Sequence, residues 1–146
     1  MRNTFLFSII ILLLAGCGKD KFNTKPSLKY KSVSTTVLHP GQIITFTLSF
    51  TDAEGDLTDT LSIMKFDPIC VNSRFTDLYV LPNFSASKNQ EGDILVTYGY
   101  NVTNYPPIQA PQCFNRNDTC VFKFVLKDKA QNRSDTAVSE TIVITQ

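Results

Sequence analysis

From Tyr30 onward the chain alternates between apolar and polar residues with a period of two. In the clearest segment, residues 42–50, the apolar side chains fall on one side and threonine or serine on the other. Such alternation is typical of a β-strand with one buried face. The same pattern, interrupted by turn residues, predicts about seven strands, at residues 30–38, 42–50, 57–66, 79–81, 93–102, 120–127 and 136–144.

Short alternating strands at this spacing predict an all-β fold, an antiparallel β-sandwich of about seven strands. No segment alternates strand with helix, and neither a G-x-G-x-x-G nor a P-loop pattern is present, which argues against an α/β enzyme. The residues expected in the core are Ile44, Phe46, Leu48, Phe50, Leu61, Ile63, Ile94, Val96, Tyr98, Tyr100, Cys120, Phe122, Phe124 and Leu126.

The first residues follow a different pattern. Arg2 precedes an apolar run from Phe5 to Leu14 that only Ser8 interrupts, and two small residues follow. The run is too short to span a bilayer, which takes about 20 apolar residues. A positive start, a short apolar run and small residues are the layout of a secretory signal peptide.

The segment Leu14-Ala15-Gly16-Cys17 resembles the lipobox of bacterial lipoproteins. The resemblance implies cleavage before Cys17, a diacylglycerol on its thiol and an acyl chain on its new amino group. Residues 1–16 would then be the signal peptide. The lipid would anchor the protein to a membrane of the cell envelope, and we favour the outer membrane. The domain would then be periplasmic or exposed on the cell surface. An ordinary signal peptide before a chance cysteine and an uncleaved membrane helix are the alternatives.

Residues 17–29 are expected to form a lipidated tether before a domain that covers residues 30–146. Five lysines lie between positions 19 and 31, opposed only by Asp20. They fit either attraction to anionic lipid headgroups or a solvated linker, and we favour the linker. The whole chain has a formal net charge of +1, so nothing in it calls for nucleic acid as a partner.

Two segments resemble cadherin-like and other immunoglobulin-like domains of bacterial surface proteins. Residues 50–57 (FTDAEGDL) are similar to a strand–turn–strand of these modules, and residues 126–134 (LKDKAQNRS) to their closing hairpin. Gln131 stands where glycine is usual. The resemblance implies an immunoglobulin-like sandwich, although the chain has no tryptophan and so lacks the Cys…Trp…Cys core of antibody domains.

The same two segments carry acidic turn residues, and in such a sandwich the two loops lie at the same end. Ca²⁺ takes six to eight oxygen ligands, which two acidic loops can supply. The preferred explanation is that these residues only shape tight turns. We therefore expect no cofactor, with Ca²⁺ as the alternative. The candidate ligands are Asp52, Glu54, Asp56, Asp128 and Asn132.

Three cysteines remain once Cys17 is lipidated, in an oxidising compartment. Cys70 and Cys113 lie in two connections that share one end of a sandwich, so we expect a disulfide between them. A Cys113–Cys120 bond is the alternative. Cys120 begins an alternating strand on its apolar side, where a thiol behaves as a small hydrophobic group.

Little in the chain suggests catalysis. His39 is the only histidine, and neither H-E-x-x-H nor G-x-S-x-G occurs. Tyr98, Tyr100 and Tyr105 are candidates for an aromatic binding platform, although we favour core packing for most of them. We therefore expect a non-catalytic binding, adhesion or envelope-assembly module whose partner is an envelope protein or a glycan. The alternatives are a structural accessory subunit of an envelope complex and a small hydrolase.

Overall fold

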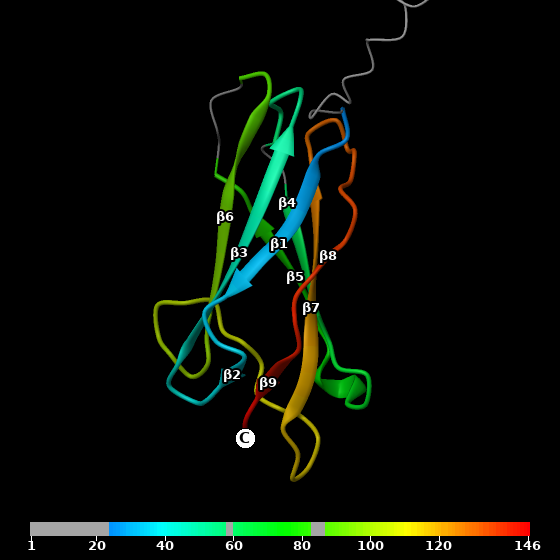
Figure 1. Ribbon diagram of the computed structural model, residues 1–146. Helices are drawn as coiled ribbons and strands as arrows, with labels where there is room; N and C mark the ends of the chain where they lie inside the picture. The colour runs from blue at the N-terminus through cyan, green and yellow to red at the C-terminus, as the bar shows by residue number, and fades with distance from the viewer. Residues whose placement is uncertain (1–23, 58–59, 83–86) are drawn as a thin grey trace, which may run out of the picture.

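The alternating segments form two β-sheets that stack face to face, as the computed structural model shows for residues 24–57, 60–82 and 87–146 (Figure 1). The first sheet has the order β1-β3-β6, with β1 (Ser27–Val33), β3 (Ile43–Asp52) and β6 (Gln90–Gly99). The second has the order β2-β9-β7-β4-β5, with β2 (Val37–Leu38), β9 (Ile142–Ile144), β7 (Asp118–Lys127), β4 (Thr60–Phe66) and β5 (Phe75–Val80). A short strand, β8 (Ala137–Val138), pairs with β7, and a 3₁₀ turn, η2 (Val71–Ser73), precedes β5. The predicted all-β sandwich is confirmed.

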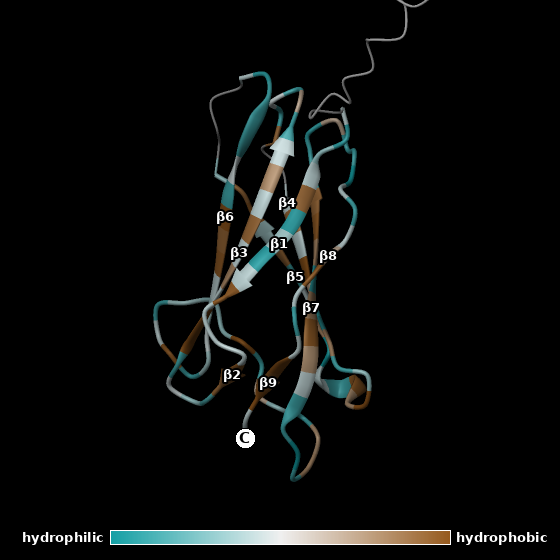
Figure 2. Cartoon of the chain, viewed as in Figure 1, coloured by the Kyte–Doolittle hydropathy of each residue, from teal (hydrophilic) through white to brown (hydrophobic). Residues whose placement is uncertain are grey.

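The core lies between the sheets, where the apolar faces of β3, β6, β4 and β7 meet. Figure 2 shows hydrophobic residues along these strands. Phe46 of β3 occupies its centre, with ring centroids 4.6 Å from Phe122 and 5.3 Å from Phe124 of the opposite sheet. All the residues that the alternation assigns to the core are buried. The period-two pattern therefore identifies the inward faces of these four strands correctly.

The first and last predicted strands each divide into two. After Val33 the chain leaves the first sheet and pairs in parallel with β9 at Val37. Near the other end, the Ser139 hydroxyl accepts the backbone N–H of Phe122 at 2.9 Å, which separates β8 from β9. The described part of the chain thus has nine strands rather than about seven, and one pair is parallel rather than antiparallel.

Several predicted strand boundaries are shifted by a few residues, and two of these shifts have a clear cause in the structure. Strand β1 begins at Ser27, inside the predicted tether 17–29, because Leu28 is buried opposite Phe50 and belongs to the core. Strand β5 begins at Phe75 rather than near residue 79. The start of β5 is not apparent in the sequence because the polar residue Asp77 interrupts the apolar pattern. In the structure Asp77 accepts a hydrogen bond from the Tyr98 hydroxyl at 3.0 Å.

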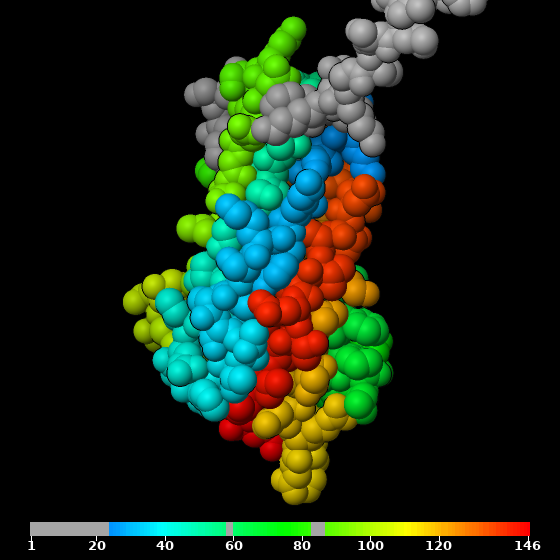
Figure 3. Space-filling model, viewed as in Figure 1, coloured from blue at the N-terminus to red at the C-terminus, as the bar shows by residue number. Residues whose placement is uncertain are grey.

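The two ends of the sandwich differ. At the end where the tether joins, which we call the tether end, Ser27 pairs with Thr51 and Lys25 forms an ion pair with Asp135 at 2.6 Å. The opposite end, the disulfide end, carries η2 and the C-terminus (Figure 1). The C-terminal segment runs alongside β1 between these ends (Figure 3). Within the described ranges, no helix has the length and apolar character needed to cross a bilayer.

Candidate metal centre

Three aspartates of two loops meet at the tether end. Asp52 is the last residue of β3, Asp56 follows in the next loop, and Asp128 comes directly after β7. Because β3 and β7 both end here, one carboxylate oxygen of each residue lies within 4.8 Å of those of the other two. Asp52 and Asp128 are fully buried and Asp56 is partly buried. We call these three residues the aspartate cluster.

The loop after β3 folds around the Asp52 side chain. Asp52 Oδ2 accepts the backbone N–H groups of Gly55 at 2.9 Å and Asp56 at 3.1 Å. Gly55 has a φ of +71°, and a Cβ there would lie 2.0 Å from the carbonyl oxygen of Ser87. Only glycine fits this position without displacing the neighbouring segment.

The second loop closes around Asp128 in the same manner. Asp128 Oδ1 accepts the backbone N–H of Asn132 at 2.7 Å, and Oδ2 accepts its side-chain N–H at 2.9 Å. Gln131 adopts a φ of +71°, a left-handed conformation, which explains why glycine is usual at this point of similar hairpins. The backbone N–H of Ala130 donates to Asp56 Oδ2 at 3.2 Å and so joins the two loops.

Two oxygens of the aspartate cluster are buried without a hydrogen bond from any described residue: Asp52 Oδ1 and Asp56 Oδ1. A buried polar atom without a partner costs free energy, and a buried carboxylate costs more. Burial raises the pKa of Asp52, the N–H groups of Gly55 and Asp56 counteract this, and the charges of Asp56 and Asp128 raise it again. A divalent cation would remove both costs, and carboxylate oxygens suit Ca²⁺ or Mg²⁺.

The structure brings together three of the five predicted ligands. Glu54 is exposed and lies outside the cluster, so the structure does not bring it together with the three aspartates. The Asn132 side chain donates a hydrogen bond to Asp128, so its role in the loop is to hold that carboxylate. Sequence reasoning missed Gln90, which pairs directly with Asp52 across β3 and β6 and therefore shares its face of the sheet. An amide oxygen is one of the ligand types that Ca²⁺ takes, but no sequence signal reveals that pairing.

At the disulfide end, Cys70 and Cys113 form the predicted disulfide, and the alternative Cys113–Cys120 is wrong. Cys120 is a free, buried thiol on the inner face of β7. Burial, more than the opposing charge of Lys65, raises the pKa of Cys120 to about 12. A thiol held in its neutral form is a poor nucleophile and behaves as a core residue.

Two other candidates do not form sites. Tyr98 and Tyr100 are buried while Tyr105 is exposed, so the three do not make one platform. The Tyr98 hydroxyl donates to Asp77, and the Tyr100 hydroxyl donates to the carbonyl of Thr145 at 2.9 Å. His39 is exposed, with Nδ1 3.1 Å from the Thr145 hydroxyl, and takes no part in a cluster of ionisable groups among the described residues.

Comparisons with known proteins give a distant structural likeness. No family model matches the chain, and no curated protein matches its sequence. Among solved structures, the sporulation control protein Spo0M from Bacillus subtilis is similar with a TM-score of 0.45 and 8% sequence identity. The match covers 84% of this chain and 50% of that one. A likeness this distant says nothing about what the chain does.

Proposed function

We propose that the chain is a bacterial lipoprotein whose β-sandwich is a non-catalytic binding module of the cell envelope. The observation that carries this proposal is the position of Leu14-Ala15-Gly16-Cys17, directly behind an apolar run of signal-peptide length. Cys17 lies outside the described residues, and β1 begins shortly after it at Ser27. A lipid on Cys17 would hold the sandwich close to a membrane, since several acyl chains anchor stably.

The anchor would orient the module. The tether end would face the membrane. The disulfide end lies at the opposite end of the sandwich (Figure 1) and would point away from the membrane. Large apolar side chains are exposed beside both halves of the disulfide: Ile69 is 68% exposed, Val71 62% and Phe114 92%. Exposed apolar residues that gather on one surface mark interaction sites. They favour an envelope protein over a glycan as the partner.

The strand arrangement supports the immunoglobulin-like class. Strands β1, β3 and β6 form one sheet, while β4, β7 and β9 form the centre of the other, so the chain crosses between layers several times. The first strand passes from one sheet to the other through β2, which lies parallel to β9. Sandwiches of this class share a two-layer packing and Greek-key connections while serving unrelated functions.

Fractionation of cells that produce the full chain tests the anchor. The wild-type protein should sediment with membranes and resist extraction by high salt. The Cys17→Ala variant should appear in the soluble fraction, whereas Cys120→Ala, which also removes one thiol, should stay with the membranes. Equal partitioning of all three proteins would refute the lipid anchor. Cross-linking in intact cells then distinguishes a binding module, with a separable partner, from an accessory subunit in one stoichiometric complex.

A second function, the binding of Ca²⁺, is favoured by one observation: Asp52 Oδ1 is fully buried in the aspartate cluster and accepts no hydrogen bond from the described residues. Calorimetric titration of the chelator-treated protein with CaCl₂ tests it. We expect one ion per chain and its loss in Asp52→Asn. Glu54→Gln, which removes an exposed charge of the same loop, should bind like the wild type. An absence of heat up to millimolar Ca²⁺ would eliminate this function.

A further inference from the structure

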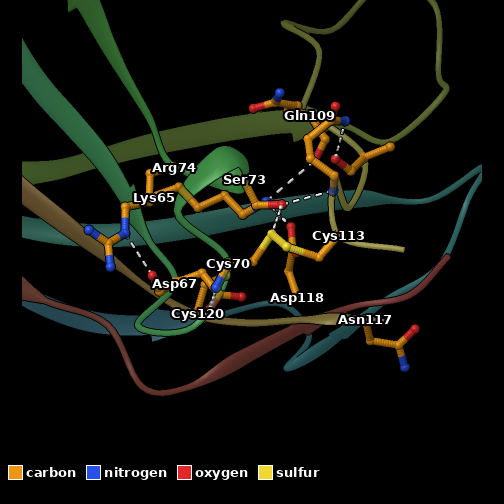
Figure 4. A network of polar contacts seen from close by, with 12 residues as sticks. Lys65, Asp67, Cys70, Ser73, Arg74, Gln109, Cys113, Asn117, Asp118 and Cys120 are labelled. Atoms are coloured by element: carbon orange, nitrogen blue, oxygen red, sulfur yellow. Dashed lines mark hydrogen bonds and ion pairs between the residues drawn. A yellow bond between two sulfur atoms is a disulfide. The ribbon is translucent and has the colours of Figure 1, made fainter. Parts of the chain in front are cut away.

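Lys65 and Asp118 form a buried pair at the disulfide end. Among the described lysines, Lys65 alone is fully buried, on the inner face of β4 after Leu61 and Ile63. Its Nζ contacts Oδ2 of Asp118, the first residue of β7, and both side chains are 0% exposed (Figure 4). Strands β4 and β7 are direct neighbours in the sheet, with Lys65 opposite Phe122. The long Lys65 side chain reaches from there to Asp118, which β7 holds in place by pairing it with Ile144 of β9.

If Lys65 and Asp118 are ionised, their surroundings offer too few hydrogen-bond partners. An ammonium group has three N–H donors and a carboxylate has two acceptor oxygens. Among the described residues, Lys65 Nζ contacts only the carbonyl of Gln109, at 3.5 Å, apart from Asp118 itself. Asp118 Oδ1 accepts no hydrogen bond from these residues. A buried ion pair is stabilising only where its remaining donors and lone pairs are also satisfied.

An amide between the same two side chains would suit the surroundings better. It carries no charge and has one N–H donor, which the carbonyl of Gln109 is placed to accept. Its single oxygen remains as a weaker acceptor than a carboxylate. From this inventory we propose that Lys65 and Asp118 are joined by an intramolecular isopeptide bond between Lys65 Nζ and Asp118 Cγ.

The reaction balances without a co-reactant. A proton passes from the Lys65 ammonium to the Asp118 carboxylate, which leaves a neutral amine beside a neutral carboxylic acid. The amine attacks Cγ, an Nζ–Cγ bond forms, a Cγ–O bond breaks, and the oxygen leaves with two hydrogens as one water molecule. Fixed juxtaposition of the two groups raises their effective concentration by orders of magnitude, and exclusion of water slows the reverse hydrolysis.

The bond would cross-link β4 to β7 beside the Cys70–Cys113 disulfide (Figure 4). The disulfide end would then be closed by two covalent links, of which only one responds to reduction. This inference does not depend on the lipid anchor or on the aspartate cluster, so it stands or falls separately from the proposed functions.

Peptide mapping of the full protein, purified, reduced, denatured and digested with trypsin, tests the proposal. Trypsin does not cleave after a lysine whose amine is acylated. We expect a branched peptide in which residues 32–74 are joined to residues 117–123, lighter by one water molecule than their sum. Quantitative cleavage after Lys65, which releases residues 32–65 and 66–74, would overturn the proposal and leave an ordinary buried ion pair.

Variants provide the controls. Lys65→Met and Asp118→Ala should each abolish the branched peptide. Lys29→Met removes an exposed lysine of β1, leaves both expected peptides unchanged in sequence, and should retain the branch. If the first two variants fail to fold, the wild-type peptide map decides the question alone.

Discussion

The backbone N–H of Cys70 donates to Asp67 Oδ1 at 2.8 Å, and this hydrogen bond positions one half of the disulfide. The same oxygen accepts the N–H of Ile69 at 2.8 Å, and Oδ2 accepts that of Thr119 at 3.1 Å. Asp67 is fully buried, so its carboxylate ties the turn after β4 to the start of β7. Figure 4 shows this carboxylate within the polar network that surrounds the disulfide.

Asp67 should make the stability of the protein depend on acidic pH. Burial alone would raise its pKa, but the three N–H groups lower it by more, so the pKa lies below its ordinary value. A lowered pKa contributes stability above the ordinary value, and that contribution is lost as the pH falls through the folded-state pKa. Urea unfolding should show Asp67→Ala less stable by about 3 kcal/mol at neutral pH, and the difference should shrink at strongly acidic pH. A pH-independent difference would contradict this role.

Asp52 should affect the pH dependence of stability in the opposite direction to Asp67. Its pKa is raised, chiefly by burial, so the folded state favours the protonated form, and stability is lost as the pH rises through the folded-state pKa. In chelator at neutral pH, Asp52→Asn should therefore be more stable than the wild type. An asparagine oxygen can still accept the N–H groups of Gly55 and Asp56.

Addition of Ca²⁺ should make the wild type more stable than Asp52→Asn, the reverse of their order in chelator. At about a hundredfold excess over its Kd, an ion that binds only the folded state stabilises by about 3 kcal/mol, which Asp52→Asn cannot gain. Thermal unfolding with and without Ca²⁺ measures the effect, with Glu54→Gln as the matched control. Identical melting temperatures of the wild type in Ca²⁺ and in chelator would exclude a metal at the aspartate cluster.

Gly55 and Gly41 offer a matched pair of substitutions. Both have a left-handed φ, +71° and +85°, but a Cβ meets the Ser87 carbonyl in the first case and nothing within 4 Å in the second. Gly41→Ala should cost about 1 kcal/mol of backbone strain. Gly55→Ala should cost about 2 kcal/mol more, because the loop that carries Asp56 must move. Chemical denaturation measures both, and equal losses would show that the close approach to Ser87 is unimportant.

The sequence predicts the long inner strands well because burial of one face imposes a strict period of two. Ile44, Phe46, Phe122 and Phe124 illustrate this, since each is fully buried where the alternation places it. The edges are predicted less well. At Ser139 a hydroxyl replaces a backbone partner, so the local pattern contains no sign of the break between β8 and β9.

The aspartate cluster is predictable in part for a related reason. Turn chemistry places Asp52 and Asp56 in one loop and Asp128 in another, and sandwich topology brings those loops to one end. Which side chains turn inward depends on the path of each loop, so Glu54 points to solvent while Asp56 does not. The partnership of Gln90 with Asp52 depends on strand register, which a single sequence does not specify in advance.

The measurement that tests the lipoprotein assignment most directly is the mass of the tryptic peptide that ends at Lys19, taken from protein isolated from its native membrane. We predict a peptide that begins at Cys17 and carries a diacylglyceryl thioether, with an acyl chain on its amino group. A peptide that runs through Gly16 into Cys17 with a free thiol would contradict the anchor and the orientation of the sandwich that depends on it.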